Sequence, residues 1–94
     1  MKDASFLDAR HKTHENLRLL RSILNQCTAE GMIDSGASLY NGVFALLEEV
    51  DAVGNWVELE ALIAQARAFE NDFVAWLSMH GRTSVSLQWP RRIS

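Results

Sequence analysis

Apolar residues recur at spacings of three, four and seven in three segments of the chain, which is the period of an amphipathic α-helix. These segments cover about residues 5–30, 36–53 and 56–80. Short stretches that contain glycine separate the segments, and the only proline of the chain follows all three. The pattern predicts an all-α fold: a small antiparallel three-helix bundle in residues 1–81, followed by an extended C-terminal tail in residues 82–94.

The first predicted helix places its apolar side chains on one face. This stripe consists of Phe6, Thr13, Leu17, Leu20, Leu24 and Cys27. Arg10 falls in the same series and weakens the prediction for the first turns. In an alternative interpretation, Thr13 caps a shorter helix that begins at His14.

The second and third predicted helices carry further signals. Apolar residues cover about half the circumference of the second helix, which predicts that it contacts two neighbours. They are Leu39, Tyr40, Val43, Phe44, Leu46, Leu47, Val50 and Val53. Asn55 and Glu58 match a capping box at the start of the third helix, with Asn in place of Ser or Thr. Gly81 stands where a left-handed C-terminal cap belongs.

Polar and apolar residues alternate along residues 84–89 of the tail, as they do in a β-strand. A single strand has no partner within this chain, so the tail either lies extended across the bundle or adds to a sheet elsewhere. Trp89 and the basic residues after it, Arg91 and Arg92, form either a docking segment for a partner or a clamp on the bundle.

Composition places the chain among globular domains. It has 94 residues, which is one domain, with 48% hydrophobic and 22% charged residues and a net charge of −3. One Arg stands against eight acidic residues in positions 31–80, so an acidic body lies between a mixed N-terminal segment and a basic tail.

Targeting and redox signals are sparse. The single cysteine, Cys27, excludes an intramolecular disulfide and a metal site built mainly on cysteines. The N-terminal segment has no apolar run of signal-peptide length, and no stretch approaches the roughly 18 apolar residues of a membrane span. We expect a cytoplasmic location.

No motif for catalysis, cofactor binding or metal binding is apparent, and we expect a protein that is not an enzyme. His11 and Glu15 are four residues apart and meet on one helix face, but a metal site needs three or four convergent ligands. Cys27 lies on the apolar stripe without a neighbouring base, which indicates a core residue.

Glu70 stands out because it lies among the apolar residues of the third predicted helix. An unpaired buried carboxylate is costly, so we expect Glu70 either to form an ion pair with Arg10, Arg18 or Arg21 of the first helix or to lie at the rim of the core. In an alternative, Glu70 and His80 serve a small helical enzyme or ligand-binding domain. The simpler expectation for His80 is a favourable interaction with the helix C-terminus.

The first predicted helix also carries a basic arc beside its apolar stripe, made of Arg10, His11, His14, Arg18 and Arg21. The arc either faces the acidic second and third helices, binds an acidic protein, or binds nucleic acid. The net negative charge argues against nucleic acid, since affinity there comes mainly from neutralising phosphates.

These observations favour a small non-catalytic module for protein–protein interaction: a regulator, adaptor, inhibitor or chaperone. The near-heptad stripe of the first helix and the small core favour a homodimer. The small helical enzyme and a nucleic-acid binder acting through the basic face of the first helix are the alternatives. The candidate partner-binding residues are Arg10, His14, Arg18, Arg21, Trp56, Trp89, Arg91 and Arg92.

Overall fold

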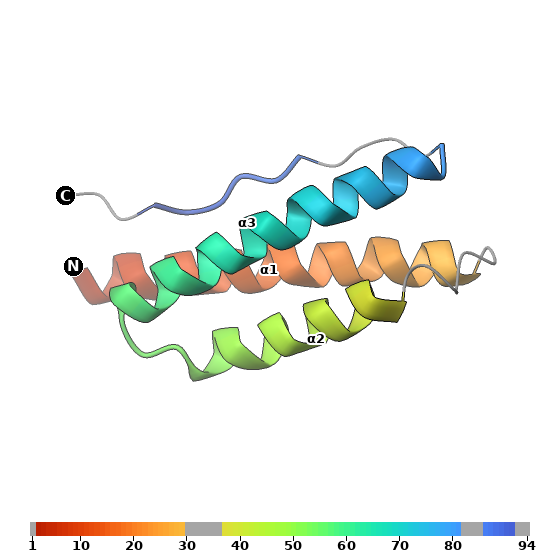
Figure 1. Ribbon diagram of the computed structural model, residues 1–94. Coiled ribbons are helices and arrows are strands. Elements are labelled where there is room, and N and C mark those ends of the chain that lie inside the picture. The colour runs from red at the N-terminus through yellow and green to blue at the C-terminus, as the bar shows by residue number, and fades with distance from the viewer. Residues whose placement is uncertain (1, 30–36, 82–85, 92–94) are drawn as a thin grey trace.

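A computed structural model describes residues 2–29, 37–81 and 86–91 of the chain. Three helices are present in these residues: α1 (Lys2–Ala29), α2 (Ala37–Ala52) and α3 (Trp56–Met79). Consecutive helices run antiparallel, and every pair of helices is in contact (Figure 1). The molecule is elongated, with extents of 45 × 21 × 17 Å. The predicted three-helix bundle is confirmed, and the helix bounds lie within a few residues of those expected from the sequence.

The core runs the length of the bundle and draws on all three helices. The stripe predicted for α1 is buried inside the chain: Leu17, Leu20 and Leu24 have no exposed surface, and Cys27 is 3% exposed. α2 contacts both other helices, as its wide apolar arc predicts. Its buried side chains and those of α3 are Val43, Leu46, Leu47, Val50, Leu59, Leu62, Ile63, Ala66, Phe73, Trp76 and Leu77.

The N-terminal half of α1 differs from the expectation. The helix continues through Arg10 because that side chain finds partners at the rim of the core: Nη1 donates to the carbonyl of Val53 at 3.2 Å, and the guanidinium lies over the Phe6 ring. Thr13 does not cap a shorter helix. It is fully buried within α1, and its hydroxyl donates to the carbonyl of Ala9 at 2.8 Å.

Both ends of α3 follow the sequence signals. The Asn55 Oδ1 atom accepts from the Glu58 backbone N–H at 2.9 Å, which confirms the predicted N-cap. The Glu58 carboxylate completes the exchange one residue further out, where it accepts from the Gly54 N–H at 2.8 Å. At the other end, Gly81 has a φ of 70°, the left-handed conformation that glycine adopts without strain, and its N–H donates to the Ser78 carbonyl.

Gly42 allows α2 and α3 to approach closely. A Cβ atom at this position would lie only 3.0 Å from Cε2 of Phe69. The absent side chain therefore makes room for an aromatic ring of the facing helix, at the cost of a poor helix former in the interior of α2.

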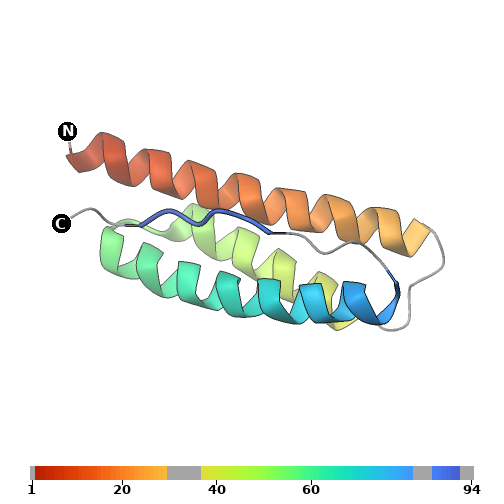
Figure 2. The same ribbon diagram turned by 90° about the horizontal axis from the view of Figure 1, so that it is seen from above.

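The described part of the tail, residues 86–91, runs back along the bundle in the seam between α1 and α3 (Figures 1 and 2). It lies extended on the bundle, as one of the two sequence-based interpretations has it. Leu87 and Trp89 pack against the core from this position. The tail thus covers apolar surface that α1 and α3 leave between them.

Candidate interaction site

The basic residues of α1 face α2 across a groove with a volume of about 280 Å³. Three of them, His14, Arg18 and Arg21, form one wall of the groove. The α2 residues that line the groove are Phe44, Leu47, Glu48 and Asp51. This α1–α2 groove unites three candidates that the sequence singles out, and it is the principal candidate site.

Because the two helices run antiparallel, residues of α1 and α2 face each other in pairs at successive heights along the groove, which we call levels. At one end His14 Nε2 lies 3.9 Å from an Asp51 carboxylate oxygen. At the other end the Arg21 guanidinium lies 5.9 Å from the centre of the Phe44 ring. Arg18 and Glu48 line the stretch between these two contacts. Each level therefore places a cationic or titratable α1 side chain opposite an acidic or aromatic α2 side chain.

The middle level of the groove has no ion pair within the described residues. Neither Arg18 nor Glu48 makes an ion pair or a hydrogen bond with a residue that the structure describes, and both are exposed to solvent. The groove holds two arginines and two carboxylates, so its formal charges balance. The α1 arc thus does face acidic residues of α2, as one sequence-based interpretation has it, but the facing charges are only partly paired.

Aromatic surface adjoins the charged residues. Phe44 is 47% exposed, although the apolar pattern of α2 places it among the helix-packing residues. Its ring stacks on Tyr40 at a centroid distance of 5.9 Å. Aromatic residues and arginine are enriched in the energetically important parts of protein interfaces. Phe44, Glu48 and Asp51 were absent from the sequence-based candidates, because helix periodicity does not show which edge of an apolar arc stays uncovered.

The remaining candidates lie elsewhere. Trp56 is half-buried and packs edge-on against Phe6 at 6.0 Å, close to Arg10 at the opposite end of the bundle from Gly81. Trp89 and the exposed Arg91 border a second, more enclosed cavity of about 290 Å³ beside Glu70. Arg92 lies outside the described residues. The structure therefore does not gather the eight candidates into one surface.

Glu70 is half-buried at the edge of the core, which agrees with one of its two expectations. The other expectation, an ion pair with an arginine of α1, is wrong, because the carboxylate instead receives hydrogen bonds from the tail. Oε2 accepts from the Leu87 backbone N–H at 2.9 Å, and Oε1 accepts from Trp89 Nε1 at 3.0 Å. On the facing helix, the Asn16 side-chain amide donates to the Gln88 carbonyl at 2.8 Å. The acid is thus compensated by neutral N–H donors, which suit a half-buried carboxylate.

Glu70 and His80 do not come together as a site. They are ten residues apart, Glu70 within α3 and His80 directly after it, or roughly 15 Å at the helical rise of 1.5 Å per residue. The His80 ring is tilted by 44° against the Trp76 ring at a centroid distance of 4.8 Å, and its Nδ1 lies 2.9 Å from the Trp76 carbonyl oxygen at the end of α3. His80 thus interacts with the C-terminal end of its own helix.

The other titratable groups lie apart from one another or in simple pairs within the described residues. Among the residues that the structure describes, no three His, Cys, Asp or Glu side chains gather where they could hold a metal ion. His11 and Glu15 meet at 3.1 Å on the exposed face of α1, as their spacing predicts. The Cys27 thiol is buried. Within the same described ranges, no helix has both the length and the apolar character needed to cross a membrane.

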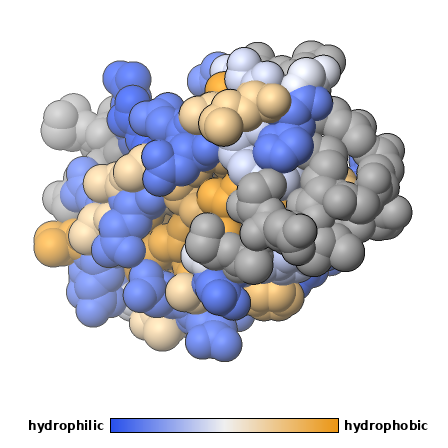
Figure 3. All heavy atoms as spheres, turned by 45° about the vertical axis from the view of Figure 1, so that its right-hand side comes forward, coloured by the Kyte–Doolittle hydropathy of each residue, from blue (hydrophilic) through white to orange (hydrophobic). Residues whose placement is uncertain are grey.

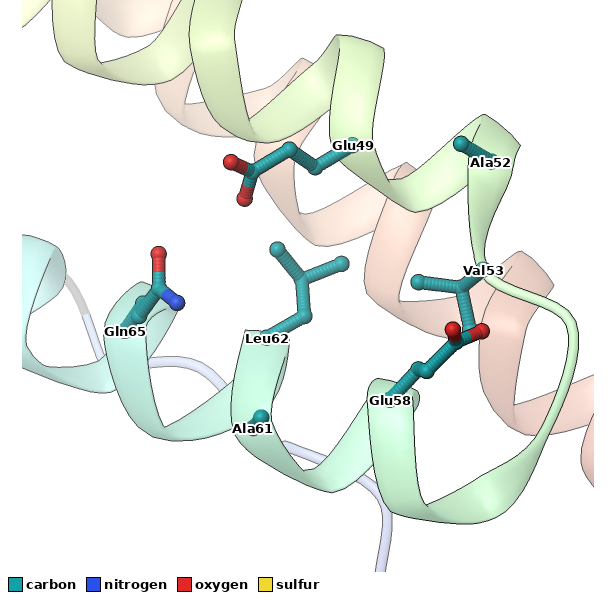
Figure 4. Close-up of a pocket in the computed structure, with 7 residues that line it drawn as sticks. All are labelled: Glu49, Ala52, Val53, Glu58, Ala61, Leu62 and Gln65. Atoms are coloured by element: carbon teal, nitrogen blue, oxygen red, sulfur yellow. The ribbon is translucent and has the colours of Figure 1, made fainter.

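A third groove lies between α2 and α3 (Figure 4). Its floor is apolar, and its polar rim consists of Glu49, Glu58 and Gln65. Glu58 is engaged in capping α3, which accounts for one of the three rim residues. The groove supplies no arrangement of side chains for chemistry.

Apolar surface is also visible at the end of the molecule where α3 finishes (Figure 3). Orange apolar side chains lie there between blue polar ones, and grey residues cover part of the view. Met79, the last residue of α3, is 83% exposed. Because residues 30–36 and 82–85 are not described, the full extent of this surface is not defined and no site is assigned to it.

Comparison with models of protein families, with curated proteins and with solved structures found no match to this chain.

Proposed function

We propose that the protein acts by binding other proteins rather than by catalysis, and that it assembles as a homodimer through the α1–α2 groove. The observation that carries this proposal is that the groove holds equal numbers of arginines and carboxylates, with cationic residues on α1 at the same heights as acidic or aromatic residues on α2. A homodimer with two-fold symmetry joins the same patch on both subunits, so that patch must be complementary to itself. The α1–α2 groove meets this condition because cationic residues line one wall and acidic residues line the other.

The symmetry follows from the layout of the two helices. A two-fold axis that runs along the groove, parallel to α1 and α2, places α1 of one subunit on α2 of the other without changing the level. Arg18 then faces Glu48 of the partner subunit. Arg21 reaches the partner's Phe44, and His14 reaches the partner's Asp51. Each charge of the middle level gains a partner, and each contact occurs twice.

The long side of the molecule measures 45 by 21 Å, so a standard interface of about 800 Å² per partner would cover most of that side. The exposed Phe44 ring and the Leu47 side chain at the groove floor supply apolar contact in the centre. The near-heptad stripe of α1 no longer supports a dimer, since it is buried within one chain.

The mixed charge of the groove also favours a protein partner over nucleic acid. Glu48 and Asp51 lie beside the arginines and would repel phosphates. A regulator, adaptor, inhibitor or chaperone that works as a homodimer fits this surface. Such a protein uses the rest of its surface to contact further proteins.

The test is the molar mass in solution, measured by light scattering at 10 to several hundred micromolar protein. We expect the wild-type chain to approach twice the 10.6 kDa of one subunit. Arg18→Glu places two pairs of like charges in the interface, so we expect its dissociation constant to rise at least tenfold. Lys12→Glu, which makes the same change of charge at an exposed residue of α1 outside the groove, is the matched control and should dimerise as the wild type does. A wild-type chain that stays at 10.6 kDa throughout refutes the proposal.

A further inference from the structure

We propose that the seam between α1 and α3 is a binding site for an extended peptide, in which an aliphatic residue and a tryptophan stand two positions apart. The chain's own tail occupies this site in the structure, and a segment of another protein with the same pattern competes for it. The site lies on a different face from the α1–α2 groove, so the inference is independent of the proposed homodimer (Figure 2).

The polar contacts of the seam recognise main chain. Asn16 on α1 donates to the Gln88 carbonyl, and Glu70 on α3 accepts from the Leu87 N–H. Both contacts are available to any extended segment, whatever its side chains. Fixed donors and acceptors on two facing walls, directed at backbone groups, are what strand-like peptide recognition uses for affinity.

The side-chain contacts of the seam give specificity. Leu87 and Trp89 are partly buried and pack on the core, whereas Ser86 and Gln88 between and beside them are exposed. This alternation is that of an extended peptide with every second side chain in a pocket. The Trp89 indole N–H also donates to Glu70, so a tryptophan is favoured over other apolar residues at this position.

An occupant of the seam replaces water at the two polar wall residues. With the tail in place Asn16 is only 4% exposed, and Glu70 accepts hydrogen bonds from Leu87 and Trp89 of the tail. If the tail leaves and nothing replaces it, water takes over these hydrogen bonds, but the apolar surface under Leu87 and Trp89 becomes exposed, which opposes an empty seam. A second peptide that supplies the same contacts covers that surface again, so exchange between occupants costs less than opening alone.

Competition with the attached tail sets the affinity. A tethered ligand acts at an effective concentration on the order of millimolar, and its occupancy lowers the apparent affinity of a free ligand. Weakening the tail should therefore expose the site to a peptide in solution. This predicts tighter binding by a variant that has lost its own Leu87 and Trp89 contacts.

The experiment uses a fluorescently labelled synthetic peptide with the sequence of residues 84–94, and the full-length chain with Leu87→Ala and Trp89→Ala. We expect this variant to bind the peptide at least tenfold more tightly than the wild-type chain does, by fluorescence anisotropy. A matched peptide with alanine in place of its tryptophan should bind at least tenfold more weakly. Adding Glu70→Ala to the variant should weaken binding of the tryptophan peptide to a similar extent. Circular dichroism establishes that each variant is folded.

Two results overturn the proposal: no binding by the folded variant, or equal binding of the tryptophan and alanine peptides. If the variant does not fold, the wild-type chain provides the test. Millimolar unlabelled peptide should then move the Trp89 indole N–H resonance of isotope-labelled protein toward the position of a free indole. An unmoved resonance also overturns the proposal.

Discussion

Asn16 and Glu70, which face each other across the α1–α3 seam, determine how the tail lies. Each directs a polar group at the tail, Asn16 from a buried position and Glu70 from a half-buried one. Their side chains carry opposite hydrogen-bonding roles, an amide donor on α1 and a carboxylate acceptor on α3. Together they fix the tail by its backbone at residues 87 and 88.

Glu70→Gln tests the carboxylate. The glutamine oxygen can still accept from the Leu87 N–H, but its amide group then faces the indole N–H of Trp89, which is also a donor. We expect a loss of roughly 1–2 kcal/mol in the free energy of unfolding, measured by urea denaturation. Trp89→Phe removes the facing donor. The free energy of unfolding lost by the double variant should therefore be smaller than the sum of the two single losses and close to the larger of them. Strictly additive losses would show that the two groups do not interact.

Gly42→Ala tests the close approach of α2 and α3. The added methyl group meets the Phe69 ring at 3.0 Å, and overpacking of this kind costs roughly 1–3 kcal/mol. The better helix propensity of alanine returns about 1 kcal/mol, so we expect a net loss of stability. In a Phe69→Leu background the ring is gone, and the same substitution should become stabilising. If the sign is the same in both backgrounds, the ring contact is not the reason for the glycine.

At the scale of elements, α3 is the helix whose limits are best determined, because a cap is present at each end. Asn55→Ala removes the acceptor for the Glu58 N–H and should lower the free energy of unfolding by about 1 kcal/mol. Asn55→Asp keeps an acceptor and should retain most of the stability. Thermal unfolding followed by circular dichroism measures both; equal stability of the alanine variant and the wild type would contradict the cap.

The elements were predictable where local chemistry specifies them. Neighbouring residues suffice to predict the three apolar periods, the Asn55 cap and the turn at Gly81, and the structure confirms all of them. The errors concern long-range partners. Arg10 is tolerated within α1 because it donates a hydrogen bond to the carbonyl of Val53, 43 residues away. Glu70 is tolerated because the tail donates hydrogen bonds to it, and the position of the tail cannot be predicted from helical periodicity. Sequence pattern shows which residues share a helix face, but not which segment covers that face.

The sequence predicted one of the two walls of the candidate site. The basic arc of α1 supplied His14, Arg18 and Arg21, which line the α1–α2 groove. The opposite wall was missed because Phe44 belongs to the apolar arc of α2 by period, yet it lies at the edge that α1 and α3 leave uncovered. Only the packing of three helices decides which edge of a wide apolar arc stays exposed.

At the scale of the whole molecule, the seam between α1 and α3 differs from the groove between α1 and α2 in what fills it. The tail fills the seam between α1 and α3 (Figure 2). The groove between α1 and α2 keeps an exposed phenylalanine, together with charges of both signs, Arg18 and Glu48, that no described residue pairs. We propose that a second subunit covers that groove, which gives this small domain a larger shared core and leaves its outer faces for further partners.

The most direct test of this account mixes two charge-reversed chains, Arg18→Glu and Glu48→Arg, and measures molar mass by light scattering. Each variant alone places like charges opposite each other at both symmetric contacts and should be largely monomeric. In the mixture, a chain with two glutamates meets a chain with two arginines, so both contacts become favourable and a heterodimer of about 21 kDa should form. Restoration by mixing cannot arise from changes within one folded chain. A mixture that stays at the mass of one subunit would contradict the proposed interface.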